Sequence, residues 1–217
     1  MRFLIALVAV VLVGATWGRP HVASAAIPGD QDQSQTVFSD YALDTMSNTK
    51  KWAQTFKPSK AGKITGIKVW LRGTTTTTTV TLTLYANDPG GTAVPGGSQT
   101  VSVSNTADDT ASWREFVFAA PVTVTNTTYA FVLTQSQTQG TFVGFADGTN
   151  LYPDGINYVW NGTSWDPFPT ADVAFVTYME PNQAPTLATN LGVTVNEGAT
   201  ATINDTKLKA TDLDGDT

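Results

Sequence analysis

The sequence predicts an all-β protein whose main part is a β-sandwich, and three observations carry this prediction. Apolar and polar residues alternate over several short segments, as they do in strands with one buried face. Clusters rich in Gly, Pro, Asn and Asp, such as NDPGG and YPDG, separate these segments and mark turns. Beyond the N-terminal segment no stretch has a convincing helical period, so we expect about nine or ten short strands.

The N-terminal segment, residues 1–25, is predicted to be a secretory signal peptide. A basic start at Arg2 precedes an apolar run over residues 3–13, and the small residues of Ala23-Ser24-Ala25 supply a cleavage site. The apolar run is shorter than the roughly 20 residues that span a bilayer, which argues against a membrane anchor. We therefore expect cleavage after residue 25, a secreted or surface-displayed product, and no transmembrane segment.

The composition after cleavage argues against nucleic-acid binding. Because Arg2 and Arg19 lie in the signal peptide, the 12 Lys and Arg fall to 10 against 18 Asp and Glu, a net charge of −8. Neutralising phosphates needs clustered Lys and Arg, which this acidic chain lacks. The chain has no cysteine, so the fold must rest on its core or on a metal rather than on disulfides.

The same composition predicts a protein that is not an enzyme. The single histidine, His21, is removed with the signal peptide, so neither a Ser-His-Asp triad nor a histidine-bound zinc site can form. Two-carboxylate glycosidase chemistry remains open in principle. However, Glu115, Glu180 and Glu197 are the only glutamates, and none stands in a recognisable catalytic setting.

Residues 31–180 form the predicted sandwich, which at about 150 residues is long enough to bury a two-sheet core. In ITGIKVWLRG the alternation sends Lys68, Trp70 and Arg72 outward. A nearly continuous apolar strand, DVAFVTY, closes the domain. The residues expected to face the core from the alternating strands are Ile67, Val69, Leu71, Val80, Leu82, Leu84, Phe116, Phe118, Val122, Val124, Tyr129, Phe131 and Leu133.

The C-terminal part is predicted to be a linker followed by an incomplete β unit. Two prolines mark residues 181–189 as the linker, since proline fixes φ and cannot donate to a strand ladder. Residues 190–217 are too few for a sheet with a closed core. Within them we expect a strand, a turn and a second strand at residues 191–195, 196–198 and 200–203.

Four segments of the main domain resemble the jelly-roll modules of bacterial exoproteins. These modules include the so-called choice-of-anchor domains and carbohydrate-binding modules. The resemblance implies a jelly-roll-like, extracellular and non-catalytic module of a larger surface or secreted protein. The segments that carry it are AQTFKPSKAGKITGIKVWL, VTLTLYANDPGGTAVPG, WREFVFAAPVTVTNTTYAFVL and YPDGINYVWNGTSWDPFPTADVAFVTY.

The C-terminal residues are similar to the opening of a bacterial cadherin-like, or chondroitin-sulfate-proteoglycan-type, repeat. NQAP matches the linker between domains, VTVNEGAT the first hairpin, and LKATDLDGD the acidic segment. Such repeats are immunoglobulin-like sandwiches of roughly one hundred residues, of which about the first third would be present. The resemblance implies Ca²⁺ at the repeat boundary.

The acidic segment is therefore a candidate calcium site. Asp212, Asp214 and Asp216 alternate along the chain, and Gly215 permits a turn that could bring their oxygens together. Ca²⁺ takes six to eight oxygen ligands, so three carboxylates need further oxygens from a folded frame. We expect them to bind Ca²⁺ only in the complete repeat, and a solvated acidic loop is the alternative.

An aromatic cluster supplies the second candidate site. Tyr152, Tyr158 and Trp160 are candidate carbohydrate-binding residues, because flat ring faces stack on sugars while nearby Asn and Asp side chains form hydrogen bonds. The alternative, which we favour, is that the rings pack along the sandwich edge. The resemblance supports this packing role for Trp165 and Asp172.

Three functions are compatible with these features. We expect a secreted or surface-displayed, non-catalytic module of a larger adhesive protein, with a cadherin-like part that depends on calcium. The alternative is a carbohydrate-binding accessory module of an exported enzyme, and the third is a purely architectural spacer. The corresponding partners are another cell-surface protein or an extracellular polysaccharide.

Overall fold

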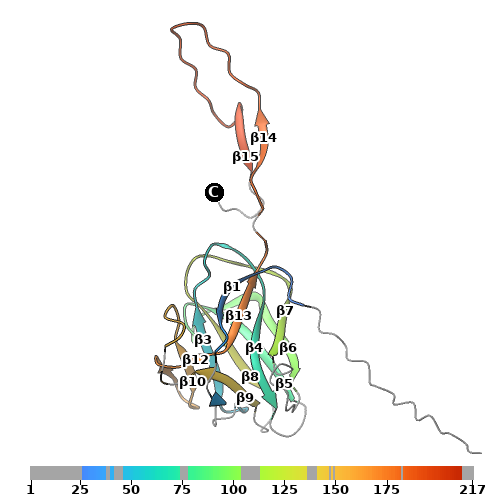
Figure 1. Cartoon of the computed structure of the whole chain (residues 1–217), viewed down its shortest axis with the longest axis vertical. Helices are drawn as coiled ribbons and strands as arrows, with labels where there is room; N and C mark the ends of the chain where they lie inside the picture. The colour runs from blue at the N-terminus through green and yellow to red at the C-terminus, as the bar shows by residue number, and fades with distance from the viewer. Residues whose placement is uncertain are drawn as a thin grey trace, which may run out of the picture.

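The computed structural model describes residues 26–37, 40–41, 46–73, 78–103, 113–135, 141–146, 148, 150–181 and 183–211. Every regular element in these residues is a β-strand, and the strands form two packed sheets and a separate hairpin (Figure 1). The predicted all-β sandwich is therefore confirmed. The predicted signal peptide lies outside the described residues.

The first sheet has seven antiparallel strands. Its order is β1-β13-β4-β9-β12, with β7 paired to β4 and β2 paired to β9. The N-terminal strand of the sandwich, β1, therefore lies beside its last strand, β13. The strands are β1 (Asp30–Gln35), β2 (Asp40–Tyr41), β4 (Gly62–Gly73), β7 (Trp113–Val124), β9 (Thr141–Ala146), β12 (Asp172–Val173) and β13 (Phe175–Met179).

The second sheet has six antiparallel strands in the order β11-β10-β3-β8-β5-β6. The two sheets together contain more strands than the nine or so expected, partly because β2 and β12 are only two residues long. The strands are β3 (Lys51–Phe56), β5 (Thr78–Ala86), β6 (Ala93–Val103), β8 (Tyr129–Gln135), β10 (Asn157–Trp160) and β11 (Trp165–Phe168).

The core lies between the two sheets. Every residue that the alternation places inward is buried, with none more than 8% exposed. Rings from both sheets meet there: Phe131 of β8 lies 5.5 Å from Phe175 of β13, and Phe56 of β3 contacts both at 6.3 Å. The period-two pattern thus identified the buried face of each strand.

Trp70 lies on the outward side of β4, as the alternation predicts, but its side chain is completely buried. Strand β9 pairs with the C-terminal end of β4, and a Cβ atom at Gly144 of β9 would lie only 2.9 Å from the indole ring. The guanidinium of Arg72 lies 5.7 Å from the ring centroid on the same side of β4. The ring therefore packs closely over Gly144 of the neighbouring strand, which alternation within one strand cannot reveal.

A bulge between β4 and β7 accommodates the proline inside a strand. Ile64 pairs with Val122 and Gly66 with Val117, so four residues of β7, among them Pro121, lie opposite one residue of β4. Proline lacks the N–H that a ladder requires, so it is tolerated at such an irregularity. A Cβ at Gly66 would lie 2.6 Å from the carbonyl oxygen of Phe116, which explains the glycine at this close approach.

The C-terminal hairpin differs from its prediction. Its paired strands are β14 (Thr186–Asn190) and β15 (Leu208–Thr211), so β14 begins inside the predicted linker. Residues 191–195 and 200–203 are not strands, although the turn around 197–198 is present. Alternation alone cannot hold these segments together, because no second layer covers them and nearly every side chain of the hairpin is exposed.

Candidate functional site

The predicted calcium ligands Asp212, Asp214 and Asp216 lie outside the described residues, so their role remains a prediction. Among the residues that the structure does describe, no three His, Cys, Asp or Glu side chains come close enough together to hold a metal ion. The described strands and loops also include no helix that could cross a membrane.

Tyr152 is a core residue and cannot offer a ring face to a ligand. It is 6% exposed, and its ring meets Phe175 edge to face at 5.2 Å. Its hydroxyl donates a hydrogen bond to Gln33 Oε1 at 3.0 Å and accepts one from the Lys57 backbone N–H at 3.2 Å. Burial raises the pKa of Tyr152 to about 12. We therefore remove Tyr152 from the candidate carbohydrate-binding residues.

Asp172 holds the loop that leads into β10. Its carboxylate is 1% exposed and accepts hydrogen bonds from the backbone N–H groups of Leu151 at 2.8 Å and Tyr152 at 2.9 Å. Gln54 Nε2 of β3 donates to the other carboxylate oxygen at 3.2 Å. These bonds join both sheets to the loop, so Asp172 positions the chain that precedes the aromatic hairpin.

The turn between β10 and β11 is held by its own polar side chains. Asn161 Oδ1 accepts hydrogen bonds from the backbone N–H groups of Thr163 at 2.8 Å and Ser164 at 2.9 Å. Asn161 Nδ2 donates to Asp166 Oδ2 at 2.7 Å. Gly162 has a φ of +102°, a conformation that a side chain would strain. The hairpin therefore presents its aromatic residues from a well-defined turn.

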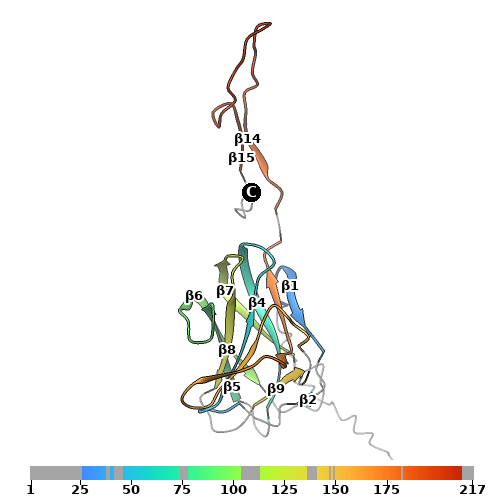
Figure 2. The same ribbon diagram turned by 90° about the vertical axis from the view of Figure 1, so that its left-hand side faces the viewer.

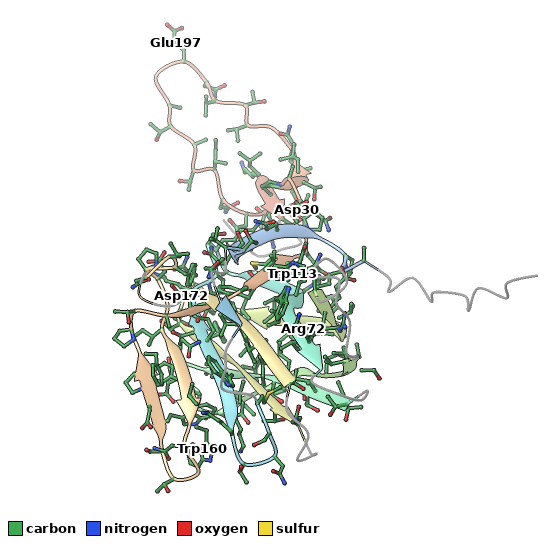
Figure 3. All side chains as sticks on the ribbon, turned by 60° about the horizontal axis from the view of Figure 1, so that its bottom comes forward. Asp30, Arg72, Trp113, Trp160, Asp172 and Glu197 are labelled. Carbon is green, nitrogen blue, oxygen red and sulfur yellow. The ribbon has the colours of Figure 1, made fainter. Side chains whose placement is uncertain are left out.

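Three aromatic rings of this hairpin lie on the outward face of the six-stranded sheet. Trp160 pairs with Trp165 across β10 and β11, and their ring centroids are 5.5 Å apart at an interplanar angle of 62°. Tyr158 stands two residues away on the same face. All three are partly exposed. Trp165, for which packing was expected, is thus half of a surface pair. Figure 3 shows its partner Trp160 well away from Asp172.

Charged and polar groups surround the tryptophan pair. The Lys51 ammonium lies 5.6 Å from the ring centroid of Trp160, within cation–π range. At the hairpin is also a pocket of about 360 Å³, lined by Trp160 and Asn161 and by Val159, Asp166 and Phe168, which alternate to the opposite side of β10 and β11 from the tryptophan pair. Phe168 is 47% exposed at its rim. Sequence spacing identified the aromatic cluster but not this pocket, which depends on how β10 pairs with its neighbours.

The arrangement combines flat apolar surfaces with amide, carboxylate and ammonium groups. Such a combination suits a polyhydroxylated ligand, whose C–H groups stack on rings while its hydroxyls form hydrogen bonds. Comparison with known proteins finds no matching family and no curated protein similar in sequence. The resemblances described above therefore rest on the quoted segments alone.

Proposed function

We propose that this protein is an exported, non-catalytic module of a larger surface or adhesive protein, and that its sandwich binds an extracellular polysaccharide. The observation that carries the proposal is the Trp160–Trp165 pair, which stands partly exposed on a hairpin with a rigid turn. Tyr158 adds a third ring to the same surface.

The contrast with other tryptophans of the sandwich supports a binding role. Trp52 is 4% exposed and Trp70 is completely buried, so these two rings contribute their full apolar area to packing. The pair on β10 and β11 instead keeps apolar area in contact with water at the sheet edge. Aromatic side chains that remain exposed next to polar groups are consistent with a ligand-binding surface.

Affinity electrophoresis in gels that contain a polysaccharide tests the proposal. We expect at least one neutral polymer, from a panel of β-glucan, xylan, galactomannan and starch, to retard the protein. Trp160→Ala should weaken this retardation at least about tenfold, which corresponds to about 1.4 kcal/mol. No retardation by any polymer, or equal retardation of the variant, would argue against the proposal.

Trp113→Ala provides a matched control. Trp113 is also partly exposed and lies under a lysine, with Lys68 Nζ 5.8 Å from its ring, but it belongs to the other sheet. Its replacement should leave the retardation unchanged. A thermal melt of both variants separates loss of binding from loss of folding.

The exposed apolar side chains of the C-terminal β14–β15 hairpin support the proposal that the sandwich belongs to a larger modular protein. The side chains of this hairpin include large apolar residues that are well exposed, among them Leu191 at 76% and Ile203 at 58%. Such residues are normally covered in a complete sandwich. Together with the resemblance to a cadherin-like repeat, this exposure supports an adhesive parent protein in which Asp212, Asp214 and Asp216 bind calcium once a complete repeat frames them.

A further inference from the structure

We infer that the binding site extends from β10 and β11 across the outward face of the whole six-stranded sheet, and that its ligand is a linear, uncharged polysaccharide lying across the strands. This inference rests on the proposed function and specifies its ligand class and extent.

The registers place the outward side chains in continuous rows. Tyr158 of β10 pairs with Ala53 of β3, and Ala53 pairs with Val132 of β8. Val132 in turn pairs with Thr83 of β5, which pairs with Ser98 of β6. Adjacent strands lie about 4.8 Å apart, so the face measures about 24 Å from β11 to β6. A row of this length suits several units of a polymer rather than a single sugar.

The small residues in the middle of the face are covered by larger neighbours. Ala53 and Ala130 are completely buried and Val132 is 3% exposed, so a ligand does not reach their side chains. Tyr158 and Tyr85, on β10 and β5, are both partly exposed and belong to the surface of this region. A ligand that crosses the strands would therefore contact these two tyrosine rings.

The far end of the face carries paired hydroxyl groups. Thr81 and Thr100 are 2.8 Å apart, oxygen to oxygen, and Thr83 and Ser98 are 3.0 Å apart. In each pair one hydroxyl donates, which leaves the hydrogen of the other hydroxyl available to a further acceptor. Thr134 lies in the same row as Thr81 on β8. This end can therefore exchange hydrogen bonds with sugar hydroxyls, while the aromatic end stacks on sugar rings.

The face is almost free of charge. Among the described side chains that point outward from these six strands, Lys51 is the single charged one. The outward face of the other sheet differs, because it carries Arg72 and a Lys68–Glu115 pair at 3.9 Å. A polyanion would lack counter-charges along the strand rows, whereas a neutral polymer needs none. The acidic character of the mature chain further disfavours a polyanion.

The two edges of the sheet project to the same side. Figure 2 shows the turn that leads into β6 standing out to the left of β8, and the hairpin that follows β9 extends to the left below it. The outward face therefore lies between its aromatic edge and its hydroxyl edge. A polysaccharide that crosses the strands would contact both edges of the face. A short ligand would contact the tryptophan pair alone.

Affinity electrophoresis of the full chain tests the inference with a charge placed at the hydroxyl end of the face. Thr83→Glu replaces one hydroxyl of the Thr83–Ser98 pair with a carboxylate, several strands away from the tryptophan pair. The matched control is Thr123→Glu on the outward face of β7 in the other sheet, where Thr123 is exposed. We expect Thr83→Glu to reduce retardation by the neutral polymers at least tenfold and Thr123→Glu to leave it unchanged. Alginate and polygalacturonate, the anionic probes, should not retard the wild-type protein.

The outcomes separate the inference from the proposed function. If Thr83→Glu binds like the wild type while Trp160→Ala does not, the extended site is wrong and the tryptophan site stands. Retardation by alginate stronger than by any neutral polymer would overturn the uncharged ligand class. If no polymer retards the wild-type protein, both the inference and the proposed function fail. Equal thermal melts of the two glutamate variants confirm that the comparison concerns binding.

Discussion

Asp172 illustrates how one buried carboxylate can organise several segments. Its side chain receives hydrogen bonds from the 151–152 loop and from Gln54 of β3, and its backbone carbonyl accepts one from Gln35 Nε2 of β1. Its ionised form is acceptor-only, which matches a set of donors converging from three directions. The aromatic hairpin depends on this loop, so a residue remote from the proposed ligand surface controls its position.

We expect Asp172→Asn to lower the free energy of unfolding by about 2–4 kcal/mol. The amide would place an N–H group against existing donors and leave a buried polar atom without its partner. Urea denaturation measures the change. Asp154→Asn, in the exposed part of the same loop, should change stability by less than about 0.5 kcal/mol. An Asp172→Asn protein as stable as the wild type would contradict the role assigned to this carboxylate.

The raised pKa of Tyr152 predicts that the protein loses stability in strong alkali. The pKa of Tyr152 is about 12 in the folded protein, mainly through burial, against an ordinary value of 10.0. Because the pKa of Tyr152 is raised in the folded state, the neutral phenol contributes fully to the free energy of unfolding below pH 10. This contribution is lost as the pH rises toward 12. The unfolding free energy should fall over this interval by at most about 2–3 kcal/mol more than in Tyr152→Phe. Parallel pH profiles of both proteins would test this, and identical slopes would contradict it.

At the scale of strands, alternation predicted the core because each strand of a sandwich has one covered face. It missed the burial of Trp70, whose outward ring packs over Gly144 of β9, and it wrongly gave strands in residues 191–203, where the described side chains are exposed. The candidate site shows the same limit. Spacing grouped the aromatic residues, but only the pairing of β10 with β3 and β11 places Trp160 on the outward face, and only the loop held by Asp172 places Tyr152 in the core.

The β14–β15 hairpin should be dispensable for the sandwich. Its strands pair with each other, and most of their side chains are exposed. A chain that ends at Pro181 should therefore keep its denaturation midpoint, with an unfolding free energy within about 0.5 kcal/mol of the full chain. Differential scanning calorimetry of the two proteins provides the comparison. A markedly lower midpoint for the shorter chain would reveal contacts that stabilise the sandwich.

At the scale of the whole molecule, Glu180 marks the end of the sandwich. Its backbone N–H donates to the Lys63 carbonyl at 2.8 Å, and its carboxylate lies 3.2 Å from the ammonium of the same lysine. The side chains of Pro181 and of residues 183–188 are exposed. Residue 180 thus contacts the backbone of β4, and β14 begins within the residues predicted as the linker.

Calcium should not stabilise the 217-residue chain. Unorganised carboxylates bind Ca²⁺ weakly, so we expect dissociation constants on the order of millimolar or weaker by calorimetric titration. The thermal midpoint should be the same with 1 mM Ca²⁺ as with chelator, since weak ligands stabilise little by mass action. Micromolar binding that disappears in Asp214→Asn would instead show that Asp212, Asp214 and Asp216 already form an organised site.

The pairing of β1 with β13 has a mechanical consequence. The strands run antiparallel, with Asp30 opposite Met179, so both ends of the sandwich leave it at the same pole. Tension applied through the two ends of the sandwich would separate β1 from β13 by breaking their hydrogen bonds one after another. It would not load all of these bonds in shear at the same time. Under such a load, the sandwich would therefore open at low force and lengthen the chain as its strands separate.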